Sequence, residues 1–397
     1  MSLPLNASQP TFSDLGVSAD LVDVLAAGGI ETAFEIQARS IPDGLAGRHV
    51  LGQAKTGSGK TLAFGIPMIE RTVDARPNHP TGLVLVPTRE LAVQVCEVLV
   101  PLAAVRQRAV EAMYGGVSID RQITALRRGV DVVVGTPGRL IDLLERGDLR
   151  LDAVEVLVLD EADRMADMGF LPQVQKILYR IPGEPQVMLF SATLAGGVGA
   201  IVRRYMKDPV SHETASKEPT VEEMEHRFLR VHEMDKVKVA AAISRGVHRT
   251  LLFCKTKRGA DQLERSLRRE GVNAAAIHGD LRQGSREKAL ADFTEGRITA
   301  LVATDVAARG LHIDAVDVVV HFDPPDDHKQ YLHRSGRTAR AGARGVAVTL
   351  LLWNEENGVR ANMRRLGLIA PIPEVFSNNP NLADVLGWEP EAAQAAV

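Results

Sequence analysis

Short, continuously apolar runs recur along the chain, and helical stretches separate them. A strand buried on both faces shows such continuous apolarity, whereas a half-exposed strand alternates. Segments such as TRELAVQVCEVLVPLAAV and GRLIDLLERG have the spacing of amphipathic helices. This alternation predicts a mostly parallel sheet with helices on both faces. The apolar runs of the first half lie at 49–53, 82–87, 131–136, 154–160 and 186–193.

The apolar pattern weakens between residues 207 and 226 and then starts again. This stretch is polar and charged and carries two prolines, so we interpret it as a linker plus an edge element. The sequence therefore predicts two α/β domains of similar size: the first at 1–207, a linker at 208–222, the second at 223–365 and a short tail at 366–397. The later apolar runs lie at 250–256, 273–279, 299–305, 316–323 and 345–351.

Composition narrows the choice of partners. The chain has 397 residues and a formal net charge of −3, so any nucleic-acid binding must come from a local surface, from backbone groups or from helix ends. The two cysteines, Cys96 and Cys254, have no CxxC spacing, which indicates free thiols in a reducing cytoplasm. The sequence shows no signal-peptide pattern and no stretch of transmembrane length, so we expect a cytoplasmic protein.

The segment AKTGSGKT at 54–61 follows the first apolar run and precedes a helical stretch. Such a strand–loop–helix cradles phosphates, because successive backbone N–H groups and the helix N-terminus face the anion. The alternative is an ordinary strand-to-helix turn, and Ala54 stands where the usual pattern has its first glycine. We expect the side chain of Lys60 to reach the β- and γ-phosphates of a nucleotide and the hydroxyl of Thr61 to bind Mg²⁺. The loop residues expected to cradle the phosphates are Thr56, Gly57, Ser58 and Gly59.

A pair of acids ends the run VEVLVLD. We expect Asp160 to hold Mg²⁺, because P-loop enzymes keep a carboxylate at this strand end. Glu161, beside it, is placed to orient or deprotonate the attacking water. An acidic helix cap after the strand explains one acid, but not an Asp-Glu-Ala-Asp sequence accompanied by a phosphate loop.

These residues resemble the DEAD-box RNA helicases, whose four-letter motif stands at 160–163. The resemblance covers roughly residues 12 to 350 and implies two RecA-like domains in tandem. It also implies an RNA-dependent ATPase that opens short RNA duplexes or remodels RNA–protein complexes. Its further motifs occur in family order: PTRELAVQ, GG, TPGRL and SAT in the first domain, then LLFCKT, HGDLRQGSRE, ATDVAARGLHI and HRSGRTAR in the second.

The segment GIETAFEIQ at 29–37 resembles the family motif that reads adenine. The resemblance implies that Gln37 bonds the base edge and that Phe12, seventeen residues before Gly29, stacks on the base. Two departures stand out. Ala33 replaces the usual proline, and His312 stands where an aspartate is common, which leaves the role of position 312 open.

By the same resemblance, the second domain completes the chemistry. Phosphoryl transfer needs charge neutralisation, and Arg337 and Arg340 are the candidate arginine fingers. Asp305 would contact the ribose. Four further residues would couple ATP to RNA across the two domains: Asp163, Ser191, Thr193 and His333.

The resemblance also implies an RNA path over both domains. Glycines let phosphates approach backbone N–H groups, so we expect binding that is nearly blind to sequence, by a monomer. The chain closes shortly after the motifs with an acidic stretch, unlike the long basic tails common in the family, so we expect either a naturally minimal or a truncated enzyme. The candidate RNA-binding residues are Thr88, Arg89, Gly115, Gly116, Thr136, Gly138 and Arg139 in the first domain and Gly279, Asp280 and Thr304 in the second.

Three alternative functions would also explain some of these motifs. A translocating superfamily 2 helicase is disfavoured by the literal Asp-Glu-Ala-Asp and by Gln37. An ATP-dependent RNA clamp without turnover is disfavoured by Glu161 and Arg337. A small-molecule kinase explains the phosphate loop but not the second domain.

Overall fold

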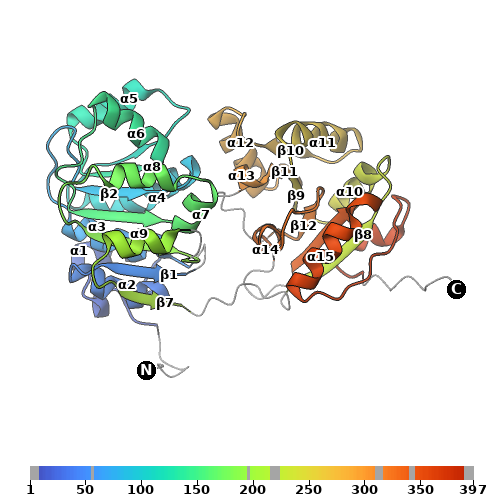
Figure 1. The fold of residues 1–397 in the computed structure, drawn as a ribbon, viewed down its shortest axis with the longest axis horizontal. Coiled ribbons are helices and arrows are strands. Elements are labelled where there is room, and N and C mark those ends of the chain that lie inside the picture. The colour runs from blue at the N-terminus through green and yellow to red at the C-terminus, as the bar shows by residue number, and fades with distance from the viewer. Residues whose placement is uncertain are drawn as a thin grey trace. The chain divides into compact units, whose positions relative to one another are not determined.

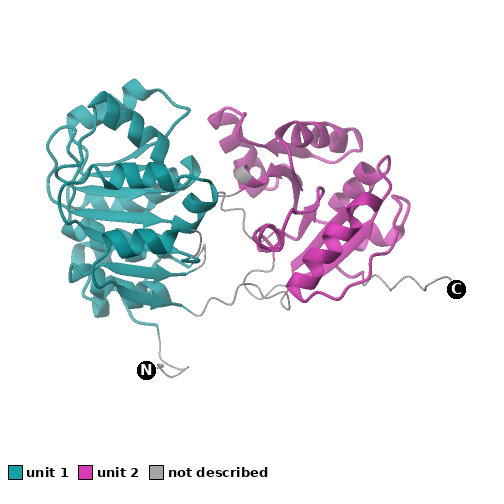
Figure 2. Cartoon of the chain, viewed as in Figure 1, with its two compact units in different colours: residues 1–216 teal, residues 217–397 magenta. Residues whose placement is uncertain are grey.

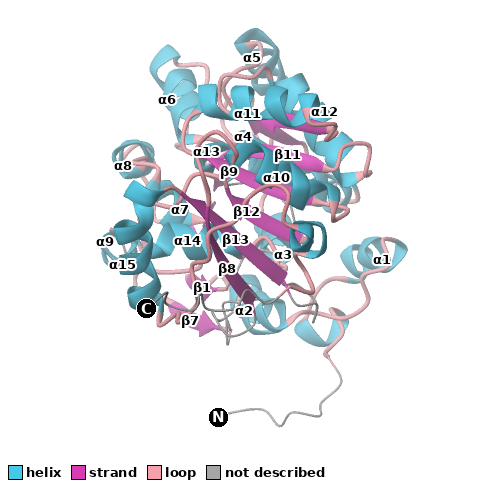
Figure 3. Cartoon of the chain, turned by 90° about the vertical axis from the view of Figure 1, so that its right-hand side faces the viewer, coloured by secondary structure: helices cyan, strands magenta, loops and turns pink. Residues whose placement is uncertain are grey.

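The computed structural model describes residues 9–54, 58–194, 197–214, 224–308, 316–338 and 345–388. The chain divides into two compact units, unit 1 at 1–216 and unit 2 at 217–397 (Figure 2). In both units helices flank a sheet of parallel strands (Figure 3).

Unit 1 is built on a seven-stranded parallel sheet with the order β3-β4-β2-β5-β6-β1-β7 (Figure 1). Its strands are β1 Val50–Gln53, β2 Gly82–Leu85, β3 Val110–Met113, β4 Val132–Gly135, β5 Val156–Asp160, β6 Gln186–Ser191 and β7 Val210–Glu213. Its helices are α1 Ala19–Ala27, α2 Glu35–Leu45, α3 Lys60–Arg71, α4 Arg89–Ala104, α5 Ile119–Arg128, α6 Pro137–Arg146, α7 Ala162–Asp167, α8 Leu171–Leu178 and α9 Val198–Tyr205, after a short 3-10 helix at Ser13–Leu15.

The continuous apolar runs form the centre of this sheet, as predicted. Successive strand side chains point to opposite faces, so Val84 joins one core with Phe64 while Leu83 and Leu85 join the other with Leu140. The first core contains residues of α1 to α4, and the second contains residues of α5 to α9. Burial on both faces is what excludes polar residues from the middle strands.

Unit 2 has a six-stranded parallel sheet with the order β10-β11-β9-β12-β13-β8. Its strands are β8 Met224–Arg230, β9 Thr250–Cys254, β10 Ala274–Ile277, β11 Ala300–Thr304, β12 Val318–His321 and β13 Gly345–Leu351. Its helices are α10 Lys236–Arg245, α11 Lys257–Arg269, α12 Gln283–Thr294, α13 Asp305–Ala308, α14 His328–Ser335 and α15 Glu356–Leu366, with 3-10 helices at Trp353–Glu355 and Pro380–Asp384.

Three strands without a continuous apolar run lie at sheet edges. β3 and β7 are the two edges of the first sheet, and β8 is one edge of the second. An edge strand exposes part of its surface to water, so its sequence alternates or turns polar. The polar stretch interpreted as a linker plus an edge contributes β7 and the start of β8.

The segment 370–388, expected to belong to a tail, packs on unit 2. Leu382 and Val385 are fully buried. The N–H of Val375 donates to the carbonyl of Arg230 over 2.8 Å, and the N–H of Arg230 donates to the carbonyl of Pro373 over 2.9 Å. These bonds cover part of the open edge of β8, which is a common way of protecting an edge strand.

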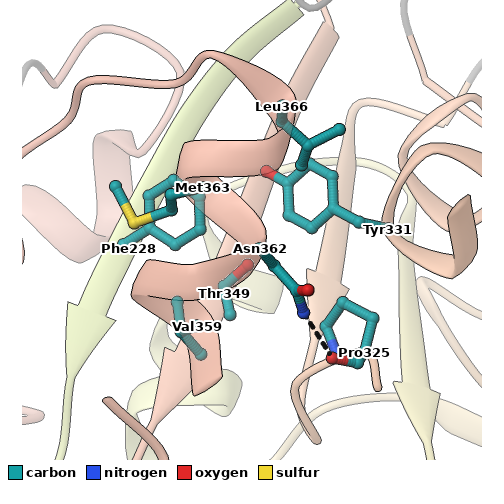
Figure 4. A pocket seen from close by; sticks show the side chains of 8 residues that line it. All are labelled: Phe228, Pro325, Tyr331, Thr349, Val359, Asn362, Met363 and Leu366. Carbon is teal, nitrogen blue, oxygen red and sulfur yellow. Dashed lines mark hydrogen bonds between the residues drawn. The ribbon is translucent and has the colours of Figure 1, made fainter. Parts of the chain in front are cut away.

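Unit 2 also encloses a small cavity of about 10 Å³ beside α15 (Figure 4). Its walls are mainly apolar, and the amide of Asn362 donates to the carbonyl of Pro325, another lining residue, over 3.1 Å. This volume holds about one water molecule, so the cavity is a gap in core packing rather than a nucleotide site. No helix within the described ranges is long and apolar enough to cross a membrane.

Candidate active site

Three neighbouring strands of unit 1 carry expected nucleotide and coupling residues. β5, β6 and β1 are adjacent in the sheet, and all three are parallel. Their carboxyl ends therefore share one edge, where open α/β sheets bind ligands. The glycine loop follows β1, the acidic pair ends β5, and Ser191 ends β6. Three segments that are far apart in sequence thus form one candidate site.

The glycine loop leads directly into α3. Gly59 precedes the helix with φ +83°, a left-handed conformation that favours glycine. A Cβ here would also clash with the Gln37 carboxamide. The ammonium group of Lys60 is largely buried and donates to the carbonyl of Ala54 over 2.7 Å. A bound phosphate would replace this carbonyl as the partner of the ammonium group. Of the other loop candidates, Thr56 and Gly57 lie outside the described residues, whereas Ser58 and Thr61 lie within them.

The acidic pair is buried. Asp160 is 2% exposed, and its Oδ1 accepts the N–H of Glu161 over 2.9 Å. Burial raises the pKa of Asp160 to about 7, the charge of Lys60 lowers it, and the charge of Glu161 adds to the rise. A carboxylate that loses its hydration in this way is stabilised by a cation.

Glu161 has an unusual conformation and a partner that the sequence analysis missed. Its φ of +52° places a non-glycine residue in the left-handed region, a feature that clusters at functional sites. Its carboxylate pairs with the guanidinium of Arg164, one helical turn later. The i, i+3 spacing of the two residues is the sequence signal that could have revealed this pair.

The oxygen donors of this site fit Mg²⁺. The described part of the chain contains no group of three or more His, Cys, Asp or Glu residues suited to holding a metal. Mg²⁺ does not need such a group, because it binds through one or two carboxylates together with substrate phosphates and water. Asp160 and Thr61 offer the oxygen atoms that this mode of binding requires.

Gln37 is held in one orientation next to the loop. Its Oε1 accepts the N–H of Phe34 over 2.8 Å, and its Nε2 donates to the carbonyl of Gly59 over 2.9 Å. Ala33, at the departure from the family motif, uses its N–H to donate to the carbonyl of Pro10 over 2.9 Å. A proline has no such N–H, so this departure adds a bond between the motif and the preceding segment.

Phe12 is buried in this structure, and its stacking on the base remains a prediction. Its side chain is 1% exposed and belongs to the apolar core with Val17 and Leu21. No face of the ring is open to a base in this structure. The physical reason is that the 3-10 turn at Ser13–Leu15 directs this aromatic residue into the core, where its large apolar surface is buried.

The expected coupling residues of unit 1 form one hydrogen-bonded group. Asp163 Oδ2 accepts the N–H groups of Ala192 and Thr193 over 3.1 and 3.0 Å. The N–H of Asp163 donates to Ser191 Oγ over 3.1 Å, and that hydroxyl donates to the carbonyl of Thr193 over 2.6 Å. The turn after β5 is therefore tied to the turn after β6. His333, the fourth expected member, lies on α14 of unit 2.

The RNA candidates of unit 1 gather at the ends of β2, β3 and β4, on the same sheet edge. The guanidinium of Arg89 lies against Gly115 and Gly116. Arg139 donates to Gln122 Oε1 over 2.6 Å and to the carbonyl of Val117 over 3.2 Å. Burial lowers the pKa of Arg139, the nearby charge of Asp142 opposes this, and the charge of Arg89 lowers the pKa further.

One of these side chains caps a helix, and one glycine is open. The hydroxyl of Thr88 caps α4 by accepting the N–H of Leu91 over 3.3 Å. Thr136 precedes α6. A Cβ at Gly138 would meet nothing within 4 Å, so the start of α6 is accessible to a ligand. Gln122, which was not among the sequence candidates, accepts a hydrogen bond from Arg139 and orients it.

In unit 2 the expected ribose contact is held by a residue that the sequence analysis missed. Arg334, 2% exposed, donates through Nε and Nη2 to the two carboxylate oxygens of Asp305, each over 2.7 Å. Gln330 Nε2 donates to the same carboxylate over 3.0 Å. Arg334 stands in the same HRSGRTAR motif as Arg337, which is 9% exposed. Arg340 and His312 lie outside the described residues.

The second-domain RNA candidates lie at the ends of β10 and β11. Asp280 pairs with the ammonium group of Lys257, and that group lies 3.9 Å from where a Cβ of Gly279 would be. Thr304 is the last residue of β11. Lys257 was not among the sequence candidates, although it begins the helix after the LLFCKT motif.

Comparison with known proteins agrees with this arrangement. A family model described as DEAD/DEAH box helicase matches residues 34–200, and one described as helicase conserved C-terminal domain matches residues 220–342. The DEAD-box ATP-dependent RNA helicase CshA of Bacillus licheniformis is 44% identical over 353 residues, which is 88% of this chain and 72% of that protein. CshA of Geobacillus kaustophilus is 45% identical over 347 residues, 87% of this chain and 74% of that protein.

The chain belongs to the DEAD-box ATP-dependent RNA helicase family. A solved structure of this family, S. cerevisiae Dbp5 bound to RNA and ADP BeF3, is 30% identical with a TM-score of 0.78, over 95% of this chain and 98% of that one. The predicted fold class, two tandem RecA-like domains, is thereby confirmed, as is the family. The roles of individual site residues remain predictions.

Proposed function

We propose that this chain uses RNA-stimulated ATP hydrolysis, with domain closure, to separate short RNA duplexes or to remodel RNA–protein complexes. The observation that carries the proposal is the order of strands in unit 1. The nucleotide candidates follow β1 and β5, the coupling candidates Ser191 and Thr193 lie at the end of β6 beside them, and the RNA candidates follow β3, β4 and β2. One sheet edge therefore supports both functions side by side.

In this mechanism unit 1 binds and orients the nucleotide. Lys60 would exchange the carbonyl of Ala54 for the β- and γ-phosphates. Asp160 and Thr61 would hold Mg²⁺, which neutralises phosphate charge when bound. Glu161 would orient the attacking water and accept its proton. Arg164 would hold the Glu161 carboxylate in place through their ion pair.

Adenine specificity follows from the fixed orientation of Gln37. Adenine presents an N6–H donor beside the N7 acceptor, and a glutamine carboxamide matches that pair. The N–H of Phe34 and the carbonyl of Gly59 determine which end of the carboxamide is oxygen and which is nitrogen. Guanine presents two acceptors at the same edge, so one of them would face the carboxamide oxygen.

The two units contribute complementary groups. The acids and the phosphate loop belong to unit 1, and Arg337, with Arg340, belongs to unit 2. Closure of the units on ATP would bring an arginine to the γ-phosphate, where its planar charged fork suits phosphate oxygens. Because ATP and RNA would each favour the closed state, each would strengthen binding of the other.

RNA would be bound mainly through phosphates and 2′-hydroxyls. The candidates Arg89 and Arg139 offer charge, and Gly138 offers open backbone, rather than groups for reading base edges; the guanidinium of Arg89 lies against Gly115 and Gly116. Such contacts give little sequence preference and can distinguish RNA from DNA. We expect the active species to be a monomer.

The test is ATP hydrolysis with and without RNA, together with unwinding of duplexes of increasing length. The proposal requires stimulation by RNA and opening of short duplexes only. Processive opening of long duplexes would instead support a translocating helicase. Tight ATP-dependent RNA binding without turnover would support a clamp.

A further inference from the structure

The exposed face of α11 is basic. The helix contains five basic and two acidic residues, in a chain whose formal net charge is −3. Its three buried side chains are apolar and lie on one face. Residues three or four positions apart share a helix face, so the opposite face presents Arg258, Gln262, Arg265 and Arg269, all of them exposed. We call Arg258, Arg265 and Arg269 the α11 stripe.

The two acids of α11 are engaged elsewhere and do not neutralise the stripe. Asp261 Oδ1 lies 2.8 Å from His278 Nε2, and Glu264 accepts Arg268 Nε over 2.6 Å. None of the three arginines of the stripe forms an ion pair with a residue in the described ranges. A solvated helix face commonly mixes both signs of charge. A surface of one sign instead attracts ligands of the opposite sign, which here are anions.

The α11 stripe begins beside the candidate RNA path of unit 2. Lys257, the first residue of α11, pairs with Asp280 and lies 3.9 Å from where a Cβ of Gly279 would be. Because β9 and β10 are both parallel to β11, the helix that connects them returns from the carboxyl edge of the sheet to the opposite edge. At 1.5 Å per residue, Arg258 and Arg269 are about 16 Å apart along the helix axis. The stripe therefore leads away from the path.

Duplex RNA matches this surface better than a single strand does. The 13 residues of α11 include no aromatic side chain, so the bases of a single strand have nothing to stack on. Guanidinium groups pair with phosphate oxygens, and duplex RNA is recognised largely through its phosphates and 2′-hydroxyls. A duplex that continues from a strand bound on the path offers such phosphates next to the stripe.

We propose that the α11 stripe binds the phosphates of the RNA duplex adjoining the strand on the RNA path, an inference that rests on the proposed function. The path holds the strand that is being separated, and the stripe holds the duplex that remains. The stripe therefore adds affinity for RNA that contains a duplex and takes no part in ATP hydrolysis. Because phosphate contacts release counterions, this added affinity falls as salt rises.

The experiment measures binding of a labelled RNA strand, and of the same strand extended by a hairpin, to the full chain at several salt concentrations. Replacing all three arginines, by Arg258→Gln, Arg265→Gln and Arg269→Gln, should flatten the slope of log affinity against log salt for the hairpin RNA by about two to three units, since each duplex phosphate contact contributes ~0.9. Binding of the single strand should stay unchanged. As the control, Arg364→Gln with Arg365→Gln removes two exposed arginines from the last turn of α15 and should affect neither RNA.

Three results would overturn the inference. One is an unchanged slope for the hairpin RNA in the triple variant. Another is an equal loss for the single strand in a triple variant that keeps its helix content by circular dichroism, which would make the stripe part of the RNA path. The third is wild-type binding of polyglutamate that equals binding of the hairpin RNA at the same salt and is lost in the triple variant, which would identify a docking surface for acidic proteins.

ATP hydrolysis stimulated by the single strand is measured on the same preparations. The triple variant should match the wild type, because the stripe does not contact the nucleotide. Absence of stimulation in the wild type would defeat the proposed function, while the binding series still decides the role of the stripe. Normal stimulation together with an unchanged slope in the triple variant would defeat the inference alone.

Discussion

The two units share a strand order but differ in the segments that come after corresponding strands. The order β3-β4-β2-β5-β6-β1 in unit 1 corresponds to β10-β11-β9-β12-β13-β8 in unit 2. β1 leads into the glycine loop and Lys60, whereas β8 leads through a loop without glycine to Lys236. β5 ends in Asp160 and is followed by Glu161, whereas β12 is followed by Phe322 and Asp323.

The corresponding charges of unit 2 serve its own structure. The ammonium group of Lys236 lies 5.0 Å from the centre of the Phe322 ring and 3.8 Å from the carboxylate of Glu355. Asp323 Oδ2 accepts the N–H of Lys255 over 2.7 Å. A shared sheet therefore does not make two ATPase sites. The loops at the carboxyl edge decide which chemistry a unit performs.

Arg337 provides the largest expected effect, because it tests whether unit 2 completes the site of unit 1. Arg337→Ala should lower RNA-stimulated turnover by about 10³-fold, as for loss of an arginine finger, with little change in ATP binding. Arg337→Lys keeps a charge but loses the planar fork, so we expect it to restore only part of the rate. Turnover close to wild type in Arg337→Ala would contradict the division of labour between the units.

Glu161 and Asp323 form a matched pair of substitutions. Glu161→Gln should keep ATP binding and lose about 10²–10⁴-fold in turnover, the usual contribution of a general base. Asp323→Asn keeps an acceptor for the Lys255 N–H and should change turnover by less than about twofold, because Asp323 would take no part in the chemistry. Single-turnover hydrolysis measures both, and equal rate losses would remove the distinction between the two acids.

Lys60 and Lys236 are the first residues of the corresponding helices α3 and α10, and they form a second matched pair of substitutions. Lys60→Ala should weaken ATP binding by roughly tenfold to a hundredfold, since a charge-assisted phosphate contact is worth ~1.5–3 kcal/mol. Lys236→Ala should leave ATP affinity unchanged and lower the free energy of unfolding of unit 2 by about 1 kcal/mol through its lost contacts with Phe322 and Glu355. Nucleotide titration and denaturant unfolding separate the outcomes, and weaker ATP binding by folded Lys236→Ala would refute the contrast.

Gln37 sharpens the comparison within unit 1 between base recognition and phosphate binding. Gln37→Ala should reduce the preference for ATP over GTP by about tenfold, the scale of a bidentate base contact. Unwinding with each nucleotide measures the preference. If the wild-type protein already uses GTP as well as ATP, the altered motif around Ala33 does not read the base.

Arg139 gives the smallest expected effect. Arg139→Ala should weaken RNA binding to a similar extent for different sequences and reduce the slope of log affinity against log salt by about one unit. Arg146→Ala, on the exposed last turn of the same helix, is the matched control and should leave the slope unchanged. A loss confined to one RNA sequence would indicate base reading rather than phosphate contact.

The amino-acid sequence alone determined the two-domain α/β class and most central strands. Fully buried parallel strands must be continuously apolar, so β2, β4, β5 and β9 are visible in the sequence. The motifs in the loops can also be recognised in the sequence. A glycine loop before a helix, or an acid at the end of a strand, involves only residues that are neighbours in the chain. The family and its ATP-dependent chemistry can therefore be inferred from short stretches of sequence.

Tertiary structure alone decided edge strands, burial and partners. β3 and β7 have mixed sequences because water meets part of their surface, and the segment 370–388 is packed because it covers the open edge of β8. Phe12 is buried while Phe34 is exposed, although each phenylalanine immediately precedes a helical segment. The burial of an aromatic residue depends on groups that are distant in the chain, and so does the pairing of Asp305 with Arg334. Local sequence does not show which distant groups will come into contact.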